Sequence, residues 1–322
     1  MDEVILLADS KSNSWKFAQK IRDYINSEKN EEVPLKEVNI QEFRNKEIYP
    51  CALENMRGKE VYFVHDSTKD PQKWWVELLL IKDLVLRASA EKLIFVLPDM
   101  FYSRQDRKDK SRVPISARAL ADSIAPGLAR IITMDLHAEQ IQGFYPPTCP
   151  LDSLLSFPIV AQSIKENPPC DLEKLVIVSP DMGGIKRASK FAEKLGINKI
   201  AMISKQRSKP GEIGKMYFLG DVEKKNVLIV DDIIDSGGTL CEAAKLLKEK
   251  GAEETYCYGT HGLFSKGTKE LFSIFDKVLT SNTHYSENPG VEVIDVSPIF
   301  AEAIYRAHKG LSISELFESY LS

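Results

Sequence analysis

The chain of 322 residues carries 43 Lys and Arg against 47 Asp and Glu, a formal net charge of −4 at pH 7. This balance excludes a protein that coats nucleic acid or another polyanion, because such proteins carry a clear basic excess. Apolar residues make up 43% and charged residues 28%, a globular composition that excludes a mainly disordered, collagen-like or coiled-coil chain.

Two further features concern location. No apolar run reaches the roughly 18 residues of a membrane helix, and the N-terminal residues lack the basic and apolar regions of a secretion signal. The five cysteines are widely spaced and form no C-x-x-C pair, which is untypical of a disulfide framework or a zinc knuckle. We therefore expect a cytoplasmic protein with neither a membrane nor a nucleic acid as a partner.

Short apolar runs alternate with helical patterns along the whole chain. Strands are predicted at Val4–Ala8, Val61–His65, Lys92–Leu97, Ile131–Asp135, Leu175–Ser179, Lys199–Ile203, Val227–Val230, Thr255–Gly259, Lys277–Thr280 and Val291–Val296. Helices are predicted at Ser14–Ile25, Trp74–Ala88, Ile115–Ala125, Ile185–Leu195, Thr239–Lys250 and Ile299–Ala307. This alternation predicts an α/β fold with mainly parallel sheets flanked by helices.

The length suggests two domains of roughly 150 residues each. Four prolines between residues 144 and 158 predict a break in regular structure, and we place the boundary there, with domains at 1–147 and 148–322. A short echo between Leu97–Met100 (LPDM) and Ser179–Met182 (SPDM) hints that one fold is used twice, although four residues can also agree by chance.

Several polar segments follow predicted strands. Residues 101–118 carry six Lys and Arg against two Asp, which suits phosphate oxygens but also fits a solvated basic loop. His137 could bind a metal or transfer protons, although a structural histidine is more common at such a position. Asp181 precedes two glycines and is a candidate Mg²⁺ ligand beside a backbone anion site. Between 205 and 215, Gly, Pro and basic residues predict a loop.

The most informative string is VLIVDDIIDSGGTL at 227–240. A buried strand ends at Asp231 and Asp232, and a Ser-Gly-Gly-Thr turn then opens a helix. Backbone N–H groups of such a turn can close around a phosphate, and the helix N-terminus adds positive charge. The carboxylates beside it make sense if they face sugar hydroxyls, a metal ion or both. The string therefore predicts a site for a phosphorylated sugar, whereas a lone DD or SGGT would be read as a helix cap with surface acids.

This string resembles the phosphoribosyl-diphosphate (PRPP) motif of the type I phosphoribosyltransferase fold. RQDRK at 104–108, TMDLHAEQIQGF at 133–144 and SPDMGGIKR at 179–187 occur with it in the chain order of the ribose-phosphate diphosphokinase (PRPP synthase) family. The resemblance extends from about Phe43 to His308. It implies two tandem phosphoribosyltransferase-like domains, the first on the ATP side and the second carrying the PRPP loop.

The resemblance also implies an activity and its residues. A family member transfers the β,γ-diphosphoryl group of ATP to ribose 5-phosphate with Mg²⁺, giving AMP and PRPP for nucleotide biosynthesis. The matching positions are Lys205 and Arg207 for catalysis; Phe43, Asn45, Glu47, Arg104, Gln105, Asp106, Arg107 and His137 for ATP; Asp231, Asp232, Asp235, Ser236, Gly237, Gly238 and Thr239 for ribose 5-phosphate; and His137 and Asp181 for the metal. Self-association into a dimer-based hexamer is implied as well.

Two segments depart from the family pattern. Asn45 and Lys46 replace the Asp and Gly of a Phe-x-Asp-Gly-Glu segment, so strictness for ATP is open. Trp74 and Trp75 stand where polar residues are usual, which leaves the hexamer and the family's regulation by phosphate and ADP open. Two alternatives to the enzyme stay in view: a catalytically silent regulatory homologue, and a phosphoribosyltransferase that consumes PRPP.

Overall fold

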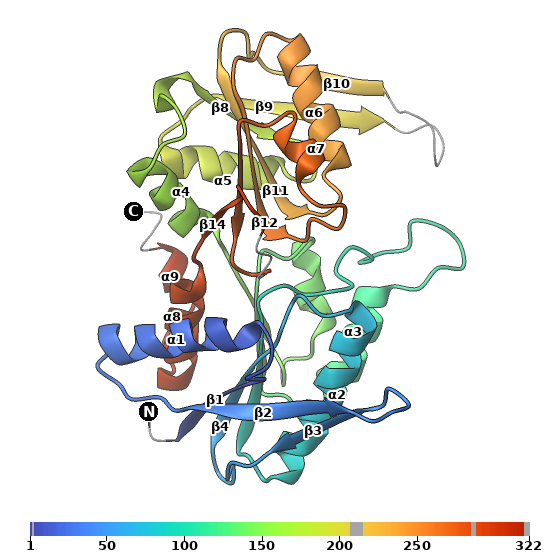
Figure 1. The fold of residues 1–322 in the computed structure, drawn as a ribbon, viewed down its shortest axis with the longest axis vertical. Coiled ribbons are helices and arrows are strands. Elements are labelled where there is room, and N and C mark those ends of the chain that lie inside the picture. The colour runs from blue at the N-terminus through green and yellow to red at the C-terminus, as the bar shows by residue number, and fades with distance from the viewer. Residues whose placement is uncertain (2, 207–214, 285–287, 319–322) are drawn as a thin grey trace.

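The protein is described by a computed structural model that covers residues 1, 3–206, 215–284 and 288–318. It consists of two α/β halves that lie one above the other in Figure 1. Each half is built on a seven-stranded sheet, in the order β3-β2-β1-β4-β5-β6-β7 and β10-β9-β8-β11-β12-β13-β14. The predicted fold class of two tandem, mainly parallel α/β domains is therefore confirmed.

In the first half, only the edge pair β2–β3 is antiparallel. Its strands are β1 Val4–Ala8, β2 Leu35–Glu42, β3 Ile48–Ala52, β4 Glu60–Val64, β5 Lys92–Leu97, β6 Arg130–Met134 and β7 Leu151–Leu154. Its helices are α1 Ser14–Glu28, α2 Pro71–Arg87, α3 Ser116–Ile124 and the 3₁₀ turn η1 Glu139–Phe144. The central strands are buried on both faces, as a parallel sheet covered by helices requires.

The second half repeats this plan, with β9–β10 as its antiparallel edge pair. Its strands are β8 Leu175–Ser179, β9 Ile200–Gln206, β10 Lys215–Leu219, β11 Asn226–Ile234, β12 Thr255–Gly262, β13 Lys277–Ser281 and β14 Glu292–Ile294. The remaining helices are α4 Phe157–Glu166, η2 Leu172–Lys174, α5 Ile185–Leu195, α6 Gly238–Glu249, α7 Lys269–Phe272, α8 Ser297–Lys309 and α9 Glu315–Glu318.

The shared strand order allows the two halves to be compared strand by strand. Val4 pairs with Glu60 in the first sheet, as Leu175 pairs with Asn226 in the second. Counting from these pairs, His65 and Asp66 take the places of Asp231 and Asp232. The LPDM and SPDM segments, by contrast, follow β5 and β8, which hold different places in their sheets. Their echo is therefore not a trace of the duplication.

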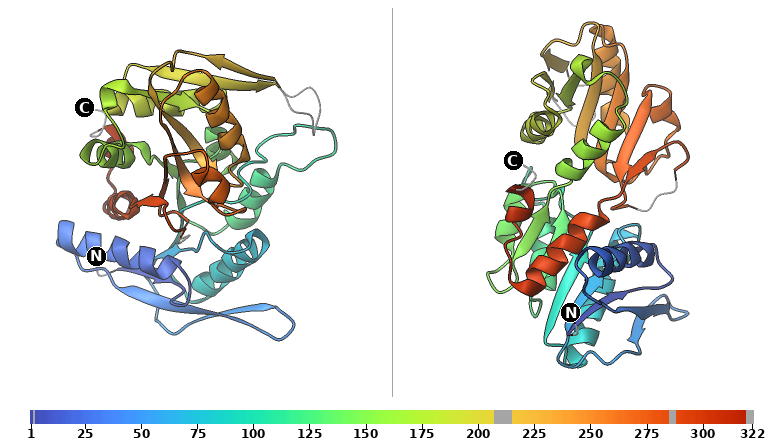
Figure 2. Two further views of the ribbon diagram at one scale, coloured as in Figure 1. Left: turned by 45° about the horizontal axis from the view of Figure 1, so that its top comes forward. Right: turned by 90° about the vertical axis from the view of Figure 1, so that its left-hand side faces the viewer.

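Each half is covered by a helix that follows the other half's last strand. Helix α4 comes after β7 but packs on the second half, where Phe157 and Val160 share a core with Phe191. Helix α8 comes after β14 but lies along α1 of the first half, with the ring of Phe300 5.3 Å from that of Phe17. Helices α1 and α8 run side by side in the right-hand view of Figure 2. This exchange ties the halves together.

Four strands (β2, β3, β7 and β10) and three α-helices (α4, α7 and α9) were not predicted from the sequence. Strands β3 and β10 lie at sheet edges, and β2, between β3 and β1, has a single fully buried residue, so none of the three requires a long apolar run. The proline-rich stretch contains β7 and the start of α4, because Pro158 occupies the first turn of α4, where its missing N–H costs nothing. Since β7 belongs to the first sheet, the division at 147 separates β7 from the strands with which it pairs.

Candidate active site

The carboxyl ends of the two sheets meet between the halves. Thr260 at the end of β12 donates a hydrogen bond to Asp135, which follows β6, over 2.7 Å. His261 Nε2 lies 3.1 Å from the carbonyl oxygen of Met134. Since loops after parallel strands emerge at this edge, residues far apart in the chain converge there.

His137 and Asp232 form the centre of the candidate site. His137 Nδ1 lies 2.7 Å from Asp232 Oδ2, although 95 residues separate them in the chain. Arg187 reaches the other oxygen of the same carboxylate, with Nη1 3.2 Å from Oδ1. Asp232 is thus held from both sides, by a histidine of the first half and by an arginine of the second.

These contacts shift the protonation of the groups involved. The hydrogen bond to Asp232 raises the pKa of His137, against the effect of burial. Burial acts to raise the pKa of Asp232, but the hydrogen bond from His137 and the charge of Arg187 outweigh it and lower that pKa. Burial and the adjacent Asp232 carboxylate raise the pKa of Asp231. The site therefore keeps Asp232 charged and makes Asp231 the more basic carboxylate.

Asp231 and Asp232 also differ in access. The Asp231 side chain is 22% exposed and that of Asp232 is 8% exposed. Asp231 lies on the open side of the pair, with Arg187 Nη1 at 3.7 Å. A ligand can therefore approach Asp231 more readily, while Asp232 organises the protein side chains around it.

The phosphate turn follows directly. Gly237 has φ of +77°, and a Cβ there would come within 2.9 Å of Leu271, so only glycine fits this position. Helix α6 begins at Gly238 and directs its N-terminus at the turn. Asp235 precedes the turn and accepts a hydrogen bond from Arg104 Nη1 at 2.6 Å. This contact joins the predicted nucleotide loop of the first half to the predicted phosphate loop of the second.

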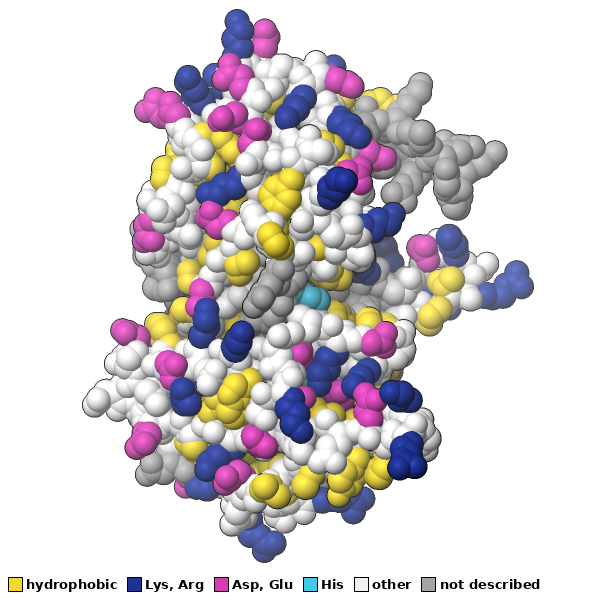
Figure 3. Space-filling view, in the orientation of Figure 1, with side chains coloured by type: hydrophobic (Ala, Val, Ile, Leu, Met, Phe, Trp, Pro, Cys, Tyr) yellow, Lys and Arg dark blue, Asp and Glu magenta, His cyan; other side chains and the backbone are white. Residues whose placement is uncertain are grey.

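Arg104 belongs to the long loop between β5 and α3. Gln105 Nε2 donates to the carbonyl oxygen of Arg107 at 3.0 Å, and Gln140 of η1 donates to the carboxylate of Asp106. The rest of the loop projects from the body of the protein, with Lys and Arg side chains at its tip (Figure 3). The base of the loop is thus anchored at the site, and its basic end is exposed.

Asp181 lies past the end of β8, as predicted. Its Oδ1 accepts the N–H of Gly184 at 2.7 Å, and Ser179 Oγ donates to its carbonyl oxygen at 2.7 Å. A Cβ on Gly184 would approach Ser179 Oγ to 2.8 Å, so this close turn requires glycine. Burial acts to lower the pKa of Arg187, but the carboxylates of Asp232, Asp135, Asp231 and Asp181 outweigh it and raise that pKa.

Other predicted residues lie elsewhere or outside the described part of the chain. Phe43, Asn45 and Glu47 form the β2–β3 turn, where Glu47 N–H donates to Asn45 Oδ1 and the Phe43 ring contacts Tyr49. Within the described residues they have no contact with the His137–Asp232 cluster. Lys46 has φ of +74°, the left-handed conformation that glycine adopts without strain. Lys205 pairs in β9 with Met216, and Arg207 lies outside the described residues.

The acidic residues at the strand ends also include candidate ligands for Mg²⁺. Among the residues that the structure describes, no group of three or more His, Cys, Asp or Glu is arranged to hold a metal ion. Mg²⁺ in such sites commonly takes one or two protein carboxylates and completes its shell with waters and substrate phosphates. Asp181, exposed and with one oxygen used by Gly184, suits that smaller donor set.

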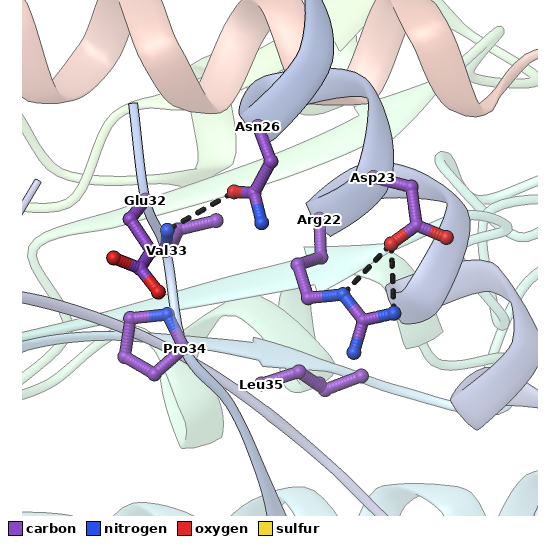
Figure 4. Close-up of a pocket in the computed structure, with 7 residues that line it drawn as sticks. All are labelled: Arg22, Asp23, Asn26, Glu32, Val33, Pro34 and Leu35. Carbon is purple, nitrogen blue, oxygen red and sulfur yellow. Dashed lines mark hydrogen bonds and ion pairs between the residues drawn. The ribbon is translucent and has the colours of Figure 1, made fainter. Parts of the chain in front are cut away.

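A surface cavity lies away from this cluster. It has a volume of about 630 Å³ and is lined by Arg22, Asp23, Asn26, Glu32, Val33, Pro34 and Leu35, between α1 and β2 (Figure 4). Arg22 is already paired with its neighbour Asp23. The chemistry of the strand-end cluster, rather than this cavity, therefore locates the candidate site.

Arg187 was missed as a site residue in the sequence. It stands in the first turn of α5, two residues after the helix begins at Ile185, within the SPDMGGIKR string. A basic residue one turn beyond a strand-end Asp-x-Gly-Gly was the available signal. Its carboxylate partners lie 44 and 45 residues further along the chain, so only the fold could assign its role.

Comparisons with known proteins agree with this arrangement. Residues 6–126 match the family model of the N-terminal domain of ribose phosphate pyrophosphokinase, and residues 159–293 match that of the phosphoribosyl transferase domain. A ribose-phosphate pyrophosphokinase of Cereibacter sphaeroides is 38% identical over 296 residues, which cover 89% of this chain and 87% of the relative. Ribose-phosphate pyrophosphokinase 4 of Saccharomyces cerevisiae is 40% identical over 292 residues, 88% of each chain.

A solved structure is similar over nearly the whole chain. The crystal structure of phosphoribosylpyrophosphate synthetase from Mycobacterium smegmatis matches with a TM-score of 0.83 and 30% identity. The match covers 96% of this chain and 99% of that one, so both halves and their mutual arrangement are shared.

Proposed function

The chain belongs to the ribose-phosphate pyrophosphokinase family, and we propose that it transfers the β,γ-diphosphoryl group of ATP to the 1-hydroxyl of ribose 5-phosphate. The hydroxyl oxygen bonds to the β-phosphorus while the bond between that phosphorus and the α,β-bridging oxygen breaks. AMP leaves with the bridging oxygen, the hydroxyl proton is released, and the second product is PRPP. The reaction supplies nucleotide biosynthesis.

The single observation that carries this proposal is the contact between two loops of different halves. His137 and Arg104 of the first half meet Asp232 and Asp235 of the second, at 2.7 and 2.6 Å. A diphosphoryl transfer needs a nucleotide and a phosphorylated sugar side by side, and positioning supplies much of the rate enhancement. A cationic loop beside an acidic, phosphate-binding turn suits that pair of substrates.

We assign the sugar to the second half. The Ser236–Thr239 turn and the α6 N-terminus bind the 5-phosphate. Asp235, at the start of this loop, holds Arg104 beside the bound sugar phosphate. Asp231, the more exposed and more basic carboxylate, binds the ribose hydroxyls, and Asp232 holds His137 and Arg187 in place. This division of roles refines the sequence-based assignment of both aspartates to the sugar.

We assign the nucleotide to the first half. Arg104, Gln105, Asp106 and Arg107 bind ATP, with His137 at the boundary of the two substrates. Phe43, Asn45 and Glu47 lie on the separate β2–β3 turn, so we propose that they reach the adenine of a second copy of the chain. Lys205 and Arg207 stabilise charge on the transferring phosphates.

Mg²⁺ is the proposed cofactor, and it neutralises phosphate charge when bound. Asp181 and His137 would hold it, the latter through Nε2, because Nδ1 already contacts Asp232. We further propose a cytoplasmic enzyme that assembles from dimers into a hexamer. In the described part of the chain, no helix has the length and apolar character needed to cross a bilayer. Light scattering of the purified protein measures the assembly directly.

The test of the reaction uses position-labelled ATP. The protein is incubated with Mg²⁺, ribose 5-phosphate and ATP labelled either at the α- or at the γ-phosphate. Diphosphoryl transfer places the γ label in PRPP and the α label in AMP. Formation of ADP would instead indicate single phosphoryl transfer, and absence of AMP at every phosphate concentration would favour the silent regulatory homologue.

A further inference from the structure

A buried charged cluster joins the two halves beside the candidate site without belonging to it. Asp99, which follows β5, is 4% exposed and accepts a hydrogen bond from His284 Nε2 at 2.8 Å. The partners are 185 residues apart and lie in different halves. The side chains of His284 and Asp99 are 8% and 6% exposed, so the pair is shielded from solvent.

A second histidine completes the cluster. His261 Nε2 lies 3.1 Å from the carbonyl oxygen of Met134 and 3.7 Å from Asp99 Oδ1. A carbonyl oxygen only accepts hydrogen bonds, so this nitrogen carries a proton that it donates to Met134, and the polar ring edge lies beside Asp99. Burial alone would raise the pKa of Asp99, but His261, His284 and Arg104 outweigh it and lower that pKa. The carboxylate is therefore charged and is compensated mainly from the second half.

Asp99 stands at the base of the loop that carries Arg104. Its own N–H lies 3.1 Å from Ser67 Oγ, and the next ring along the chain, Phe101, lies 5.9 Å from the ring of His284. Met100 and Ser103 are only 3% and 5% exposed, so the segment between Asp99 and Arg104 is packed against the protein and has little freedom to move. A shift of the Asp99 carboxylate is therefore transmitted to the guanidinium that contacts Asp235.

We propose that Asp99 is a positioning residue, which through His284 fixes the loop base, and with it Arg104, against the second half. It touches no substrate itself. The inference rests on the proposed function, because it concerns the ATP side of that site. A buried carboxylate is a costly way to gain stability alone, because it must be taken out of water. Here it connects the half that binds nucleotide to the half that binds the sugar phosphate.

The decisive variant is Asp99→Asn, which keeps the shape and an acceptor oxygen but removes the charge. We expect the KM for ATP to rise about tenfold, because a small misplacement of a positioning group is costly. The KM for ribose 5-phosphate should change less than about twofold, since its loop belongs to the other half. Asp122→Asn is the matched control: it removes an exposed carboxylate on α3 that pairs with Arg118, and both KM values should stay at wild type.

A second variant keeps the proposal testable if Asp99→Asn does not fold. A double variant tests whether Asp99 acts through Arg104. His284→Gln retains a donor toward Asp99 and should reproduce the ATP-selective effect in weaker form. If Asp99→Asn fails to fold, His284→Gln tests the proposal in its place: the KM for ATP should rise and the KM for ribose 5-phosphate should not. In an Arg104→Ala background, Asp99→Asn should add no further loss of ATP affinity, since Asp99 acts through Arg104.

The outcomes separate the two proposals. A wild-type protein that forms no AMP would refute the proposed function itself. If the wild type is active but the folded variants change both KM values equally, or neither, the positioning role is wrong. Additive losses of ATP affinity in the double variant would equally overturn action through Arg104.

Discussion

His65 and His137 both follow a strand of the first sheet, yet their surroundings shift protonation in opposite directions. His65 is fully buried beside Trp74, and burial lowers its pKa to about 3. His137 is 42% exposed and gains a proton-stabilising hydrogen bond to Asp232. The short distance of 3.6 Å between His65 and Glu77 is therefore not an ion pair, since His65 stays neutral. Lys69, 2.7 Å from Glu77, carries the compensating charge.

The neutral state of His65 predicts a loss of stability in acid. The unfolded chain binds a proton at this residue below about pH 6.5, whereas the folded chain resists it down to about pH 3. The contribution of His65 to the free energy of unfolding is thus complete above about pH 6.5. It falls as pH decreases, by up to about 1.4 kcal/mol per pH unit. When the pH is lowered from 7 to 5, the free energy of unfolding should fall by about 2 kcal/mol more in the wild type than in the His65→Gln variant. Urea denaturation at both pH values measures this, and identical losses would contradict it.

Lys205 sits at the end of β9, next to the segment outside the described residues. The family resemblance predicts that Lys205→Ala lowers kcat by about 10²- to 10³-fold, as loss of a transition-state charge contact does. The KM values should change little, because the contact forms mainly as charge develops. The control is Lys245→Ala on the exposed face of α6. Turnover near wild type in the Lys205 variant would remove this residue from the mechanism.

At the scale of elements, the exchanged helices α4 and α8 carry much of the contact between the halves. Helix α8 buries Ile299, Phe300 and Ile304 in the core that contains Phe17 of α1. Charged contacts at its end reinforce it, since Lys309 pairs with Glu31, which also binds the N-terminal amine. A helix that packs on its own half would contribute to one core, whereas α8 couples the last strand of one half to the core of the other.

Phe300→Ala should therefore destabilise the first half although it lies in the last helix. Replacing a fully buried Phe by Ala typically lowers the free energy of unfolding by about 3–5 kcal/mol, because apolar burial is lost and a cavity remains. Phe272→Ala on α7 is the control, because that ring is 37% exposed and should cost much less. Urea denaturation followed by circular dichroism measures both. Equal effects would mean that α8 is dispensable for the first core.

At the scale of the whole molecule, one fold is used twice but only one copy keeps an open phosphate turn. In the first half, Asp70–Lys73 take the place of the Ser236–Thr239 turn, and the Asp70 side chain accepts the N–H groups of Gln72 and Lys73 at 2.9 and 3.3 Å. Backbone groups that could meet a phosphate are thus satisfied internally. The first half is left to contribute its loop and His137 to the site of the second.

The exchange of helices predicts that the two halves unfold together. Each core loses a covering helix when the other half opens, so a half-unfolded state exposes apolar surface on both sides. Scanning calorimetry of the purified protein should show one transition, with a ratio of calorimetric to van't Hoff enthalpy of about one for the unfolding unit. Two well-separated transitions would contradict this coupling.

The central strands and the phosphate turn could be predicted because their signals are local. Buried parallel strands are continuous apolar runs, and Val4–Ala8, Lys92–Leu97 and Leu175–Ser179 were predicted with the bounds that the structure has. Edge strands such as β3 and β10 carry no such run, and α4 was hidden because Pro158 is a helix starter as well as a breaker.

Sequence alone determined the α/β class, the strand ends that carry polar groups, and the string 227–240 that indicates a phosphorylated sugar. The tertiary structure alone decided that Arg187 and His137 meet at Asp232, that Asp99 pairs with His284, and that α4 and α8 exchange halves. The physical reason is the range of the interactions. Backbone conformation and hydrophobic periodicity act over a few neighbouring residues, whereas these contacts form only when two sheets, each already assembled, bring their carboxyl ends together.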